Sequence, residues 1–216
     1  MANTKSRTPA PRIIAAESDL REGVRALRRR CAVMRRVHDA AGDPPLRRRP
    51  PGFEGLARIV VGQQLSTASA NAIWGRFRAL IEPFDAKTLL AAPEESLRGA
   101  GLSGPKIRTL RAVACAVAER RLDLEGLIDA EDEAVHAALT AVSGLGPWTA
   151  DIFLMFCLGR RDAFAASDLA LQVAAAGVLG IGRRPSPREL IDIAERWRPW
   201  VTSKGLCQEK EGADAL

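Results

Sequence analysis

The sequence predicts an all-α fold, for three reasons. Apolar residues recur at intervals of three and four along most of the chain, which is the spacing of one helix face. Helix-capping residues and prolines separate these periodic stretches. No convincing alternation of apolar and polar residues suggests a strand. With 216 residues, of which 47% are hydrophobic, the chain can form one large domain or two interdigitated small ones.

The first predicted helix follows Ser18, which we expect to be its N-cap. One apolar stripe runs along it, formed by Leu20, Val24, Leu27, Cys31 and Met34. A proline-rich linker over residues 43–51 then ends the helix, because proline cannot continue a helix interior.

Residues 53–80 are predicted to form two helices with a break at residues 62–65, where Ser66 or Thr67 can cap the second one. Further helices are expected at residues 93–100, 105–121, 131–142, 147–158, 169–179 and 187–197. The last of these has the best local signal, since Ser186 and Glu189 form a capping box around a proline at the first helical position.

The positive charge of the chain is concentrated near its N-terminus. The net charge is +6, but residues 1–50 hold 13 basic and 5 acidic side chains, which leaves the remaining residues with a net charge of −2. Runs such as Arg28–Arg30 suit a polyanion, most plausibly a nucleic acid. A solvated helix face would have the same composition, so charge alone leaves both interpretations open.

Composition also excludes several classes of protein. No apolar run approaches the roughly 18 residues of a membrane span, and the first dozen residues lack the apolar core of a secretory signal. We therefore expect no membrane association and a cytoplasmic, nucleoid-associated or nuclear location. The four cysteines are scattered singly, without the spacing of a zinc site or an iron–sulfur cluster.

The segment from Leu139 to Ala150 reads as a helix, a Gly-x-Gly hairpin and a second helix that begins near Pro147. Gly144 and Gly146 let the chain turn tightly and leave backbone N–H groups directed outward at a helix N-terminus, an arrangement that binds phosphate. A tight turn without a ligand would show the same pattern.

Asp168 directly precedes the apolar helix predicted at residues 169–179. Aspartate is among the best N-cap residues, so a capping role explains it without any chemistry. A carboxylate at this position can also act in catalysis.

The order and spacing of these elements resemble the helix-hairpin-helix (HhH-GPD) base-excision DNA glycosylases, in particular the short form of DNA-3-methyladenine glycosylase II. The resemblance rests on VVGQQLSTASANAIWGRF, GLSGPKIRTLRAVA, VSGLGPWTADIFLMFCLGRRDAF, AASDLAL and AERWRPW. It implies two all-α lobes with the active site in the cleft between them. Residues 13–200 would form the glycosylase domain, with the hairpin motif at about residues 133–158, between a flexible tail at residues 1–12 and an atypical, disordered tail at residues 201–216.

The resemblance also implies the chemistry. Asp168 matches the catalytic aspartate of the family, and Trp148 lies where lyase-active members have a lysine. Without that amine no Schiff base forms, and water becomes the nucleophile. The expected activity is therefore hydrolysis of alkylated purines from double-stranded DNA in base excision repair, without lyase activity. Trp148, Ile152 and Leu169 would line the base pocket, although a core position is the ordinary role of a lone tryptophan.

Contacts with DNA are expected from three regions. Gln64, or alternatively Leu65, would fill the gap left by a flipped base, while an interhelical hydrogen bond is the other interpretation of Gln64. Lys106 is a candidate phosphate contact, although a solvated lysine is the more ordinary interpretation. The hairpin glycines, Gly144 and Gly146, would grip the DNA backbone.

Family members hold a monovalent cation, Na⁺ or K⁺, through hairpin carbonyls, which here would be those of Thr140, Val142 and Gly144. We expect no required cofactor, no iron–sulfur cluster and a monomer. The sequence after Trp200 lacks the apolar helix of the family, so we expect Leu27, Met34 and Leu171 to be short of packing partners. A non-catalytic helix-hairpin-helix DNA-binding protein with an incomplete pocket is therefore the alternative function.

Overall fold

A computed structural model describes residues 12–202, and its regular structure is helical. The α-helices are α1 (Glu17–Arg30), α2 (Ala32–Ala41), α3 (Phe53–Gly62), α4 (Thr67–Leu80), α5 (Ala86–Ala91), α6 (Glu94–Gly99), α7 (Gly104–Ala118), α8 (Asp132–Thr140), α9 (Pro147–Ile152), α10 (Leu169–Leu179) and α11 (Pro187–Ala194). Three short elements complete them: η1 (Gly126–Ile128), the π-helical η2 (Phe153–Leu158) and η3 (Glu195–Trp197). Within residues 12–202, strand-like pairing is confined to one bridge, between Ile13 and Arg160. The all-α prediction is confirmed.

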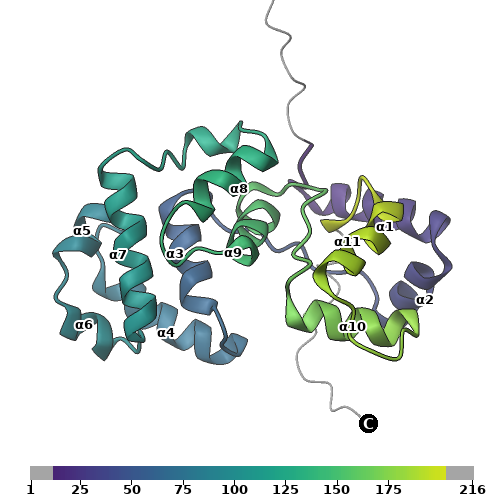
Figure 1. Cartoon of the computed structure of the whole chain (residues 1–216), viewed down its shortest axis with the longest axis horizontal. Helices are drawn as coiled ribbons and strands as arrows, with labels where there is room; N and C mark the ends of the chain where they lie inside the picture. Colours follow the sequence, from purple (N-terminus) through teal and green to yellow (C-terminus); the bar gives the residue numbers. More distant parts are fainter. Residues whose placement is uncertain (1–11, 203–216) are drawn as a thin grey trace, which may run out of the picture.

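The helices form two lobes that lie side by side (Figure 1). One lobe contains α3–α9, and the other contains the N-terminal helices α1 and α2 together with α10 and α11. The chain therefore passes between the lobes twice, through the linker before α3 and again through the segment between η2 and α10. Among residues 12–202, no helix is both long enough and apolar enough to cross a membrane.

The first helix differs from the prediction. Its N-cap is Ala16 rather than Ser18, and the Asp19 carboxylate accepts the N–H groups of Ala15 and Ala16, both at 2.9 Å. The predicted single stripe is divided between α1 and α2, because Cys31 takes an extended conformation with φ −138° and ψ 113°. Both halves of the stripe still face the core.

The remaining helices follow the local signals of the sequence closely. Ser66 caps α4, and its Oγ accepts the N–H of Ser69. The capping box of Ser186 and Glu189 is formed at the start of α11. Three elements were not predicted, one of them the 3-10 helix η1. Asp85 caps the additional short helix α5, and the helix expected at residues 147–158 changes after Ile152 into the π-helical η2.

Residues 159–163 form the crossing segment, in which the chain passes from one lobe to the other, and they also bind the N-terminal segment before α1. The N–H of Ile14 donates to the carbonyl of Gly159 at 2.7 Å. The guanidinium of Arg160, only 2% exposed, donates to the carbonyls of Ile128 and Ala130 at 3.1 and 2.6 Å. It also pairs with Asp132 at 3.0 Å, so this buried cation ties the crossing segment to the α3–α9 lobe.

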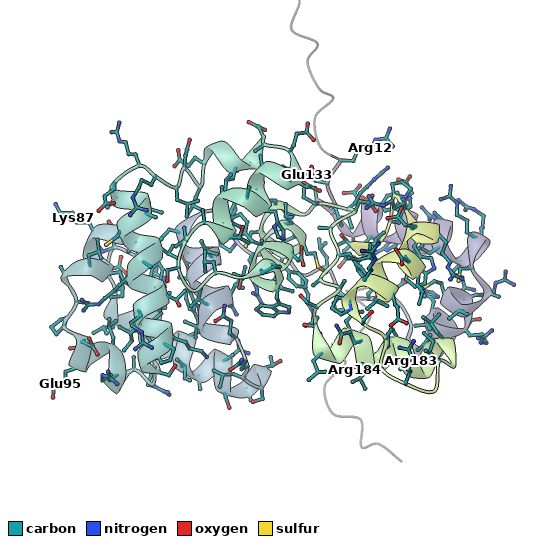
Figure 2. The ribbon with its side chains drawn as sticks, viewed as in Figure 1. Arg12, Lys87, Glu95, Glu133, Arg183 and Arg184 are labelled. Atoms are coloured by element: carbon teal, nitrogen blue, oxygen red, sulfur yellow. The ribbon has the colours of Figure 1, made fainter. Side chains whose placement is uncertain are left out.

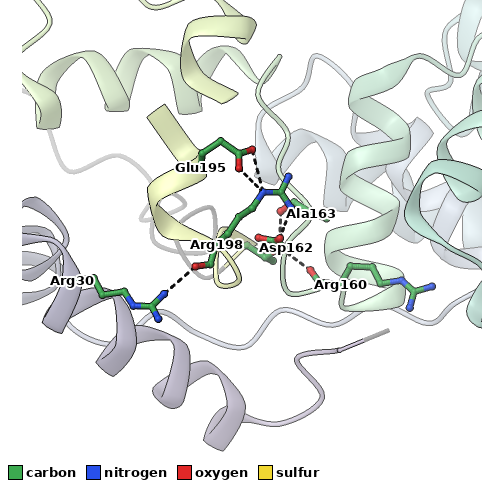
Figure 3. A network of polar contacts seen from close by, with 7 residues as sticks. Arg30, Arg160, Asp162, Ala163, Glu195 and Arg198 are labelled. Atoms are coloured by element: carbon green, nitrogen blue, oxygen red, sulfur yellow. Dashed lines mark hydrogen bonds and ion pairs between the residues drawn. The ribbon is translucent and has the colours of Figure 1, made fainter. Parts of the chain in front are cut away.

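The end of the described chain is bound to the same segment (Figure 3). Oγ1 of Thr202 lies 2.7 and 2.6 Å from the carbonyl oxygens of Arg160 and Ala163, and its single O–H can donate to either. Arg198 pairs with Asp162 and Glu195, and its own carbonyl accepts the guanidinium of Arg30 at 3.0 Å (Figure 3). The chain after α11 therefore holds α1 and the crossing segment together.

Two expectations about the C-terminal end are wrong. Val201 and Thr202, assigned to the tail from the sequence, are 2% and 1% exposed because they pack onto the crossing segment. The side chains expected to lack partners are also buried, with exposed fractions of 3% for Leu27, 6% for Met34 and 3% for Leu171. Residues 1–11 and 203–216, which hold the rest of both predicted tails, lie outside the described residues.

Candidate active site

Asp168 caps α10 and also makes a contact across the lobe boundary. One carboxylate oxygen, Oδ1, accepts the N–H of Leu171 at 2.9 Å, which is the predicted capping bond. The other oxygen, Oδ2, accepts the indole N–H of Trp148 at 2.8 Å. Trp148 belongs to α9 in the other lobe, so this bond joins two candidate site residues from opposite lobes.

The indole of Trp148 is half-buried, so a position in the core and a position beside the base pocket are compatible for this residue. It packs against the main hydrophobic core, as a structural tryptophan would. Its N–H lies in the ring plane, so the bond to Asp168 uses one edge of the indole and occupies neither of its faces.

The two other predicted pocket residues have different surroundings. Ile152, one turn after Trp148 on α9, is 8% exposed and belongs to the main core. Leu169 directly follows Asp168 and is 57% exposed. The structure thus places Ile152 in the main core and Leu169 on the surface of α10.

Packing within the protein requires glycine at one of the two hairpin positions but not at the other. Gly144 has φ +87°, and a Cβ atom there would lie 2.0 Å from Oγ1 of Thr109, so packing within the protein demands glycine. Gly146, the N-cap of α9, has φ −103°, and a Cβ there would meet open space. Nothing within the described fold explains glycine at position 146, whereas the approach of an external backbone would.

The turn between α3 and α4 holds the candidate wedge. Gln64 and Leu65 are both exposed, and Gln64 has φ +55°. The interhelical hydrogen bond considered for Gln64 is made by its neighbour instead: Nε2 of Gln63 donates to Oγ1 of Thr149 at 2.9 Å. Because the two glutamines are adjacent, the sequence alone does not indicate which side chain faces α9.

Lys106 is not the freely solvated lysine that the sequence allowed. Its amine donates to the carbonyl of Val61 at 2.7 Å, near the C-terminus of α3. Burial lowers the pKa of this half-buried amine below its usual value. An ammonium has three donors, so a phosphate contact stays compatible with this bond.

Part of the basic N-terminal cluster stabilises the fold. Arg28 pairs with Asp39, and Arg30 donates to the carbonyl of Arg198. The guanidinium of Arg49 lies 5.4 Å from the ring centroid of Phe156. These contacts account for three of the arginines without a polyanion.

The resemblance implies a cation at the hairpin carbonyls, which follow the end of α8. Thr140 ends α8, so the candidate carbonyls lie at the negative end of that helix dipole. The carbonyl of Val142 accepts the N–H of Leu145 at 3.1 Å and keeps one lone pair free. By contrast, residues 12–202 bring together no group of three or more His, Cys, Asp or Glu side chains that could hold a metal ion.

A cavity of about 270 Å³ lies between the lobes, apart from Trp148 and Asp168. It is lined by Asp132, Glu133, His136, Asp151, Leu154, Asp162, Ala163, Phe164, Ile191, Ala194, Glu195, Arg198 and Val201. Burial raises the pKa of Asp151 to about 7. The nearest base is His136, whose Nε2 is 3.7 Å from Oδ1 of Asp151, too far for a hydrogen bond. Asp151 was not singled out from the sequence, although its apolar neighbours Ala150 and Ile152 are the kind of residues that surround a buried position.

Comparison with known families decides the classification. The family model described as "HhH-GPD superfamily base excision DNA repair protein" matches residues 57–199. The chain belongs to this superfamily. The match includes the turn between α3 and α4, the hairpin, Trp148 and Asp168, so the sequence-based resemblance is confirmed at family level.

Named relatives agree with this placement. DNA-3-methyladenine glycosylase 1 of Schizosaccharomyces pombe is 29% identical over 175 residues, covering 70% of this chain and 72% of that protein. The crystal structure of DNA-3-methyladenine glycosidase from Bacillus halodurans superposes with a TM-score of 0.72 and 33% identity, over 91% of this chain and 89% of the other. The S. pombe 3-methyladenine DNA glycosylase (Mag1) in complex with abasic DNA gives a TM-score of 0.82 at 24% identity, covering 90% and 99% of the two chains, and supports the fold.

Because the Asp151 carboxyl has a raised pKa in the folded protein, it should make stability depend on pH. The folded state keeps this proton up to about pH 7, whereas an unfolded aspartate loses it near pH 4. Stability from this group is therefore lost as the pH rises from 4 to 7, by up to about 4 kcal/mol. We expect Asp151→Asn to raise the melting temperature at pH 8 and to leave it nearly unchanged at pH 4.5.

The exposed Asp192 on α11 provides the matched control, since Asp192→Asn makes the same chemical change at the surface. It should shift the melting temperature little at either pH. An Asp151→Asn variant that is less stable than wild type at pH 8 would show that the charged carboxylate is well compensated in the fold.

Proposed function

We propose that this chain is a monofunctional DNA glycosylase that hydrolyses the N-glycosidic bond of alkylated purines in double-stranded DNA. One observation carries the proposal: the Asp168 carboxylate, the residue matched to the family's catalytic aspartate, is fixed at the lobe boundary by the indole N–H of Trp148. The names of the relatives support alkylated purines as the substrate class.

A single carboxylate is sufficient for this reaction. Hydrolysis of a neutral glycoside ordinarily needs one group to protonate the leaving oxygen and a second group at the anomeric carbon. A purine alkylated at N3 or N7 is already cationic and leaves as a neutral base without an acid. Asp168 then needs only to stabilise positive charge on the deoxyribose or to orient and deprotonate water.

The contacts of Asp168 favour the electrostatic role. Each of its oxygens accepts one N–H group, and the carboxylate lies at the positive end of the α10 dipole. A negative charge is therefore held at one place before substrate arrives. Such preorganised charge is the form of transition-state stabilisation that needs no rearrangement during the reaction.

The surroundings also fit water as the nucleophile. Residues 12–202 contain two lysines. Lys87 lies at the outer end of the α3–α9 lobe (Figure 2), and the amine of Lys106 is bound to the carbonyl of Val61. At position 148 the chain has an indole, which cannot form a Schiff base.

The alkylated base must leave the duplex before its glycosidic bond can be reached, at a cost of a few kcal/mol that is smaller for damaged pairs. The bond to Asp168 uses only the edge of the Trp148 indole, so the part of this half-buried ring that does not pack on the core would be available to a cationic base, which an electron-rich indole attracts. Gln64 or Leu65, both exposed on the α3–α4 turn, would fill the gap in the stack.

The hairpin would bind the DNA backbone through the N–H groups near Gly146. We also propose that the carbonyls of Thr140, Val142 and Gly144 hold a monovalent cation there, since hard cations of this kind take oxygen ligands. Its positive charge would draw a phosphate to the hairpin.

Substitution at Asp168 separates capping from catalysis. Asp168→Asn still caps α10 but carries no charge. We expect release of methylated purines from treated DNA, measured by chromatography, to fall by at least about 10²-fold. The affinity for DNA should stay close to that of wild type. The melting temperature should fall only by the loss of one hydrogen bond, because the single amide oxygen can cap α10 but cannot also accept the indole N–H of Trp148. Equal release by both proteins would leave Asp168 as a cap and favour the non-catalytic DNA-binding alternative.

Trp148→Phe is the companion variant, because it keeps an aromatic ring and removes the N–H that Asp168 accepts. We expect slower base release with little change in KM. Neither wild type nor variant should be trapped on DNA by borohydride, and a covalent adduct formed during turnover would contradict the monofunctional assignment.

The two hairpin glycines form a matched pair. Gly144→Val should lower the melting temperature, because its side chain would collide with Thr109. Gly146→Val should lower stability far less, by the cost of a poorer N-cap for α9, and should weaken binding to damaged and undamaged DNA alike, since phosphate contacts carry no sequence information. Unaltered affinity in the Gly146→Val protein, measured by fluorescence anisotropy, would remove the hairpin from the DNA interface.

Replacing Na⁺ and K⁺ by tetramethylammonium at constant ionic strength tests the proposed cation. Tetramethylammonium is too large for a carbonyl site, so DNA affinity should fall and recover when K⁺ is added. An affinity that is the same in all three salts would contradict a bound cation.

A further inference from the structure

The turn that holds the candidate wedge has an unfavourable backbone for its sequence. The N–H of Leu65 donates to the carbonyl of Gly62 at 3.4 Å, and Gln63 has φ −54° and ψ 130°. With φ +55° at Gln64, these angles describe a type II turn. The third residue of such a turn is ordinarily glycine, because any side chain there is strained.

Glutamine at this position is not explained by packing. Its side chain is exposed, so burial does not compensate the left-handed backbone. Strain of this kind persists only where the surrounding structure enforces it, and it concentrates at functional sites. The surroundings of the turn are therefore informative.

Two contacts from other helices hold the turn in place. On one side, the amine of Lys106 at the start of α7 donates to the carbonyl of Val61 at 2.7 Å. On the other, Nε2 of Gln63 donates to Oγ1 of Thr149 on α9 at 2.9 Å. Thr149 is only 1% exposed, so its hydroxyl has few alternative partners.

The second contact leads directly to the reacting centre. Thr149 follows Trp148 in α9, and Trp148 donates to Asp168. The turn is thus bound to α9, the same helix whose Trp148 binds the carboxylate of Asp168. A residue entering the DNA from this turn would keep a fixed distance from the site that receives the flipped base.

We propose that Gln63 and Lys106 are positioning residues that hold the strained turn at residues 62–65, so that Gln64 enters the space left by the flipped base. This inference rests on the proposed function, which supplies the flipped base. It assigns to Gln63 and Lys106 a role in flipping that is separate from binding the duplex.

The bond between Gln63 and Thr149 can be removed from either side. Gln63→Leu and Thr149→Val each keep the approximate size of the side chain and lose the hydrogen bond. Flipping is followed by the fluorescence of 2-aminopurine placed beside the lesion, and base release by single-turnover kinetics. Each variant should reduce both by about three- to tenfold, the range expected for one hydrogen bond.

Because both variants remove the same bond, the double variant should be no worse than either single variant. Affinity for undamaged duplex should stay within about twofold of wild type. The defect should also shrink when the lesion is opposite a mismatched base, because less flipping energy is then needed. A general loss of structure would instead lower every one of these quantities.

Lys106→Met tests the other support. It should reduce flipping in the same way while leaving the salt dependence of duplex binding unchanged. A reduced salt dependence with normal flipping would make Lys106 a phosphate contact and remove it from the proposal.

A second residue with positive φ provides a matched control for the backbone strain at Gln64. Arg120 is the other non-glycine residue with positive φ among residues 12–202, at φ +58° beyond the far end of α7. Gln64→Gly and Arg120→Gly should both raise the melting temperature, since glycine relieves the strain. Only Gln64→Gly should reduce flipping.

Flipping at the wild-type level in Gln63→Leu or Thr149→Val, or losses that add in the double variant, would overturn the inference. A wild-type protein that gives no 2-aminopurine signal would overturn it as well. A wild type that flips but releases no base would contradict the proposed catalytic function alone, because the variants would still differ in flipping.

Discussion

The two oxygens of one carboxylate link the lobes of this protein. Asp168 accepts a backbone N–H of α10 with Oδ1 and the indole N–H of Trp148 in α9 with Oδ2. Its position depends in turn on the segment before it. Gln172, 6% exposed, donates to the carbonyl of Ala166 at 2.8 Å and fixes the turn that leads into α10. Further back, Arg160 and Thr202 anchor the crossing segment to both lobes. The position of the Asp168 carboxylate therefore depends on this network of hydrogen bonds.

The same network explains why capping and catalysis are compatible roles for one residue. A capping carboxylate is rigid, because the helix N-terminus fixes one of its oxygens. A charge that stabilises a developing cation gains from the same rigidity, since it needs no reorientation during the reaction. The sequence presented the two roles of Asp168 as alternatives, whereas the geometry is compatible with both at once.

Helix boundaries with a strong local cause were predictable. The Ser186 and Glu189 capping box and the Ser66 cap depend on residues within one turn of each other, and both are present. The break at Cys31 was not predictable, because the apolar stripe continues through it and the cause is the packing of two helices against one core. The change to π-helix after Ile152 likewise has no local signal.

The candidate site likewise combines features that have a local sequence signal with features that have none. Trp148 and Asp168 were each singled out from motifs, but their hydrogen bond joins helices of different lobes and no spacing rule predicts it. Which hairpin glycine is demanded by packing depends on Thr109, which is remote in sequence. The assignment of the interhelical bond to Gln63 rather than Gln64 depends on the turn type, and hence on the direction of each side chain.

The central claim is that Asp168 acts as a fixed negative charge opposite the anomeric carbon. Duplexes with two abasic analogues test it most directly: a pyrrolidine, which is cationic where the transition state is, and a neutral tetrahydrofuran of the same shape. We expect wild type to bind the pyrrolidine duplex at least about tenfold more tightly, consistent with a charge-assisted contact. Asp168→Asn should bind both duplexes equally. The same preference for the cation in both proteins would contradict the account.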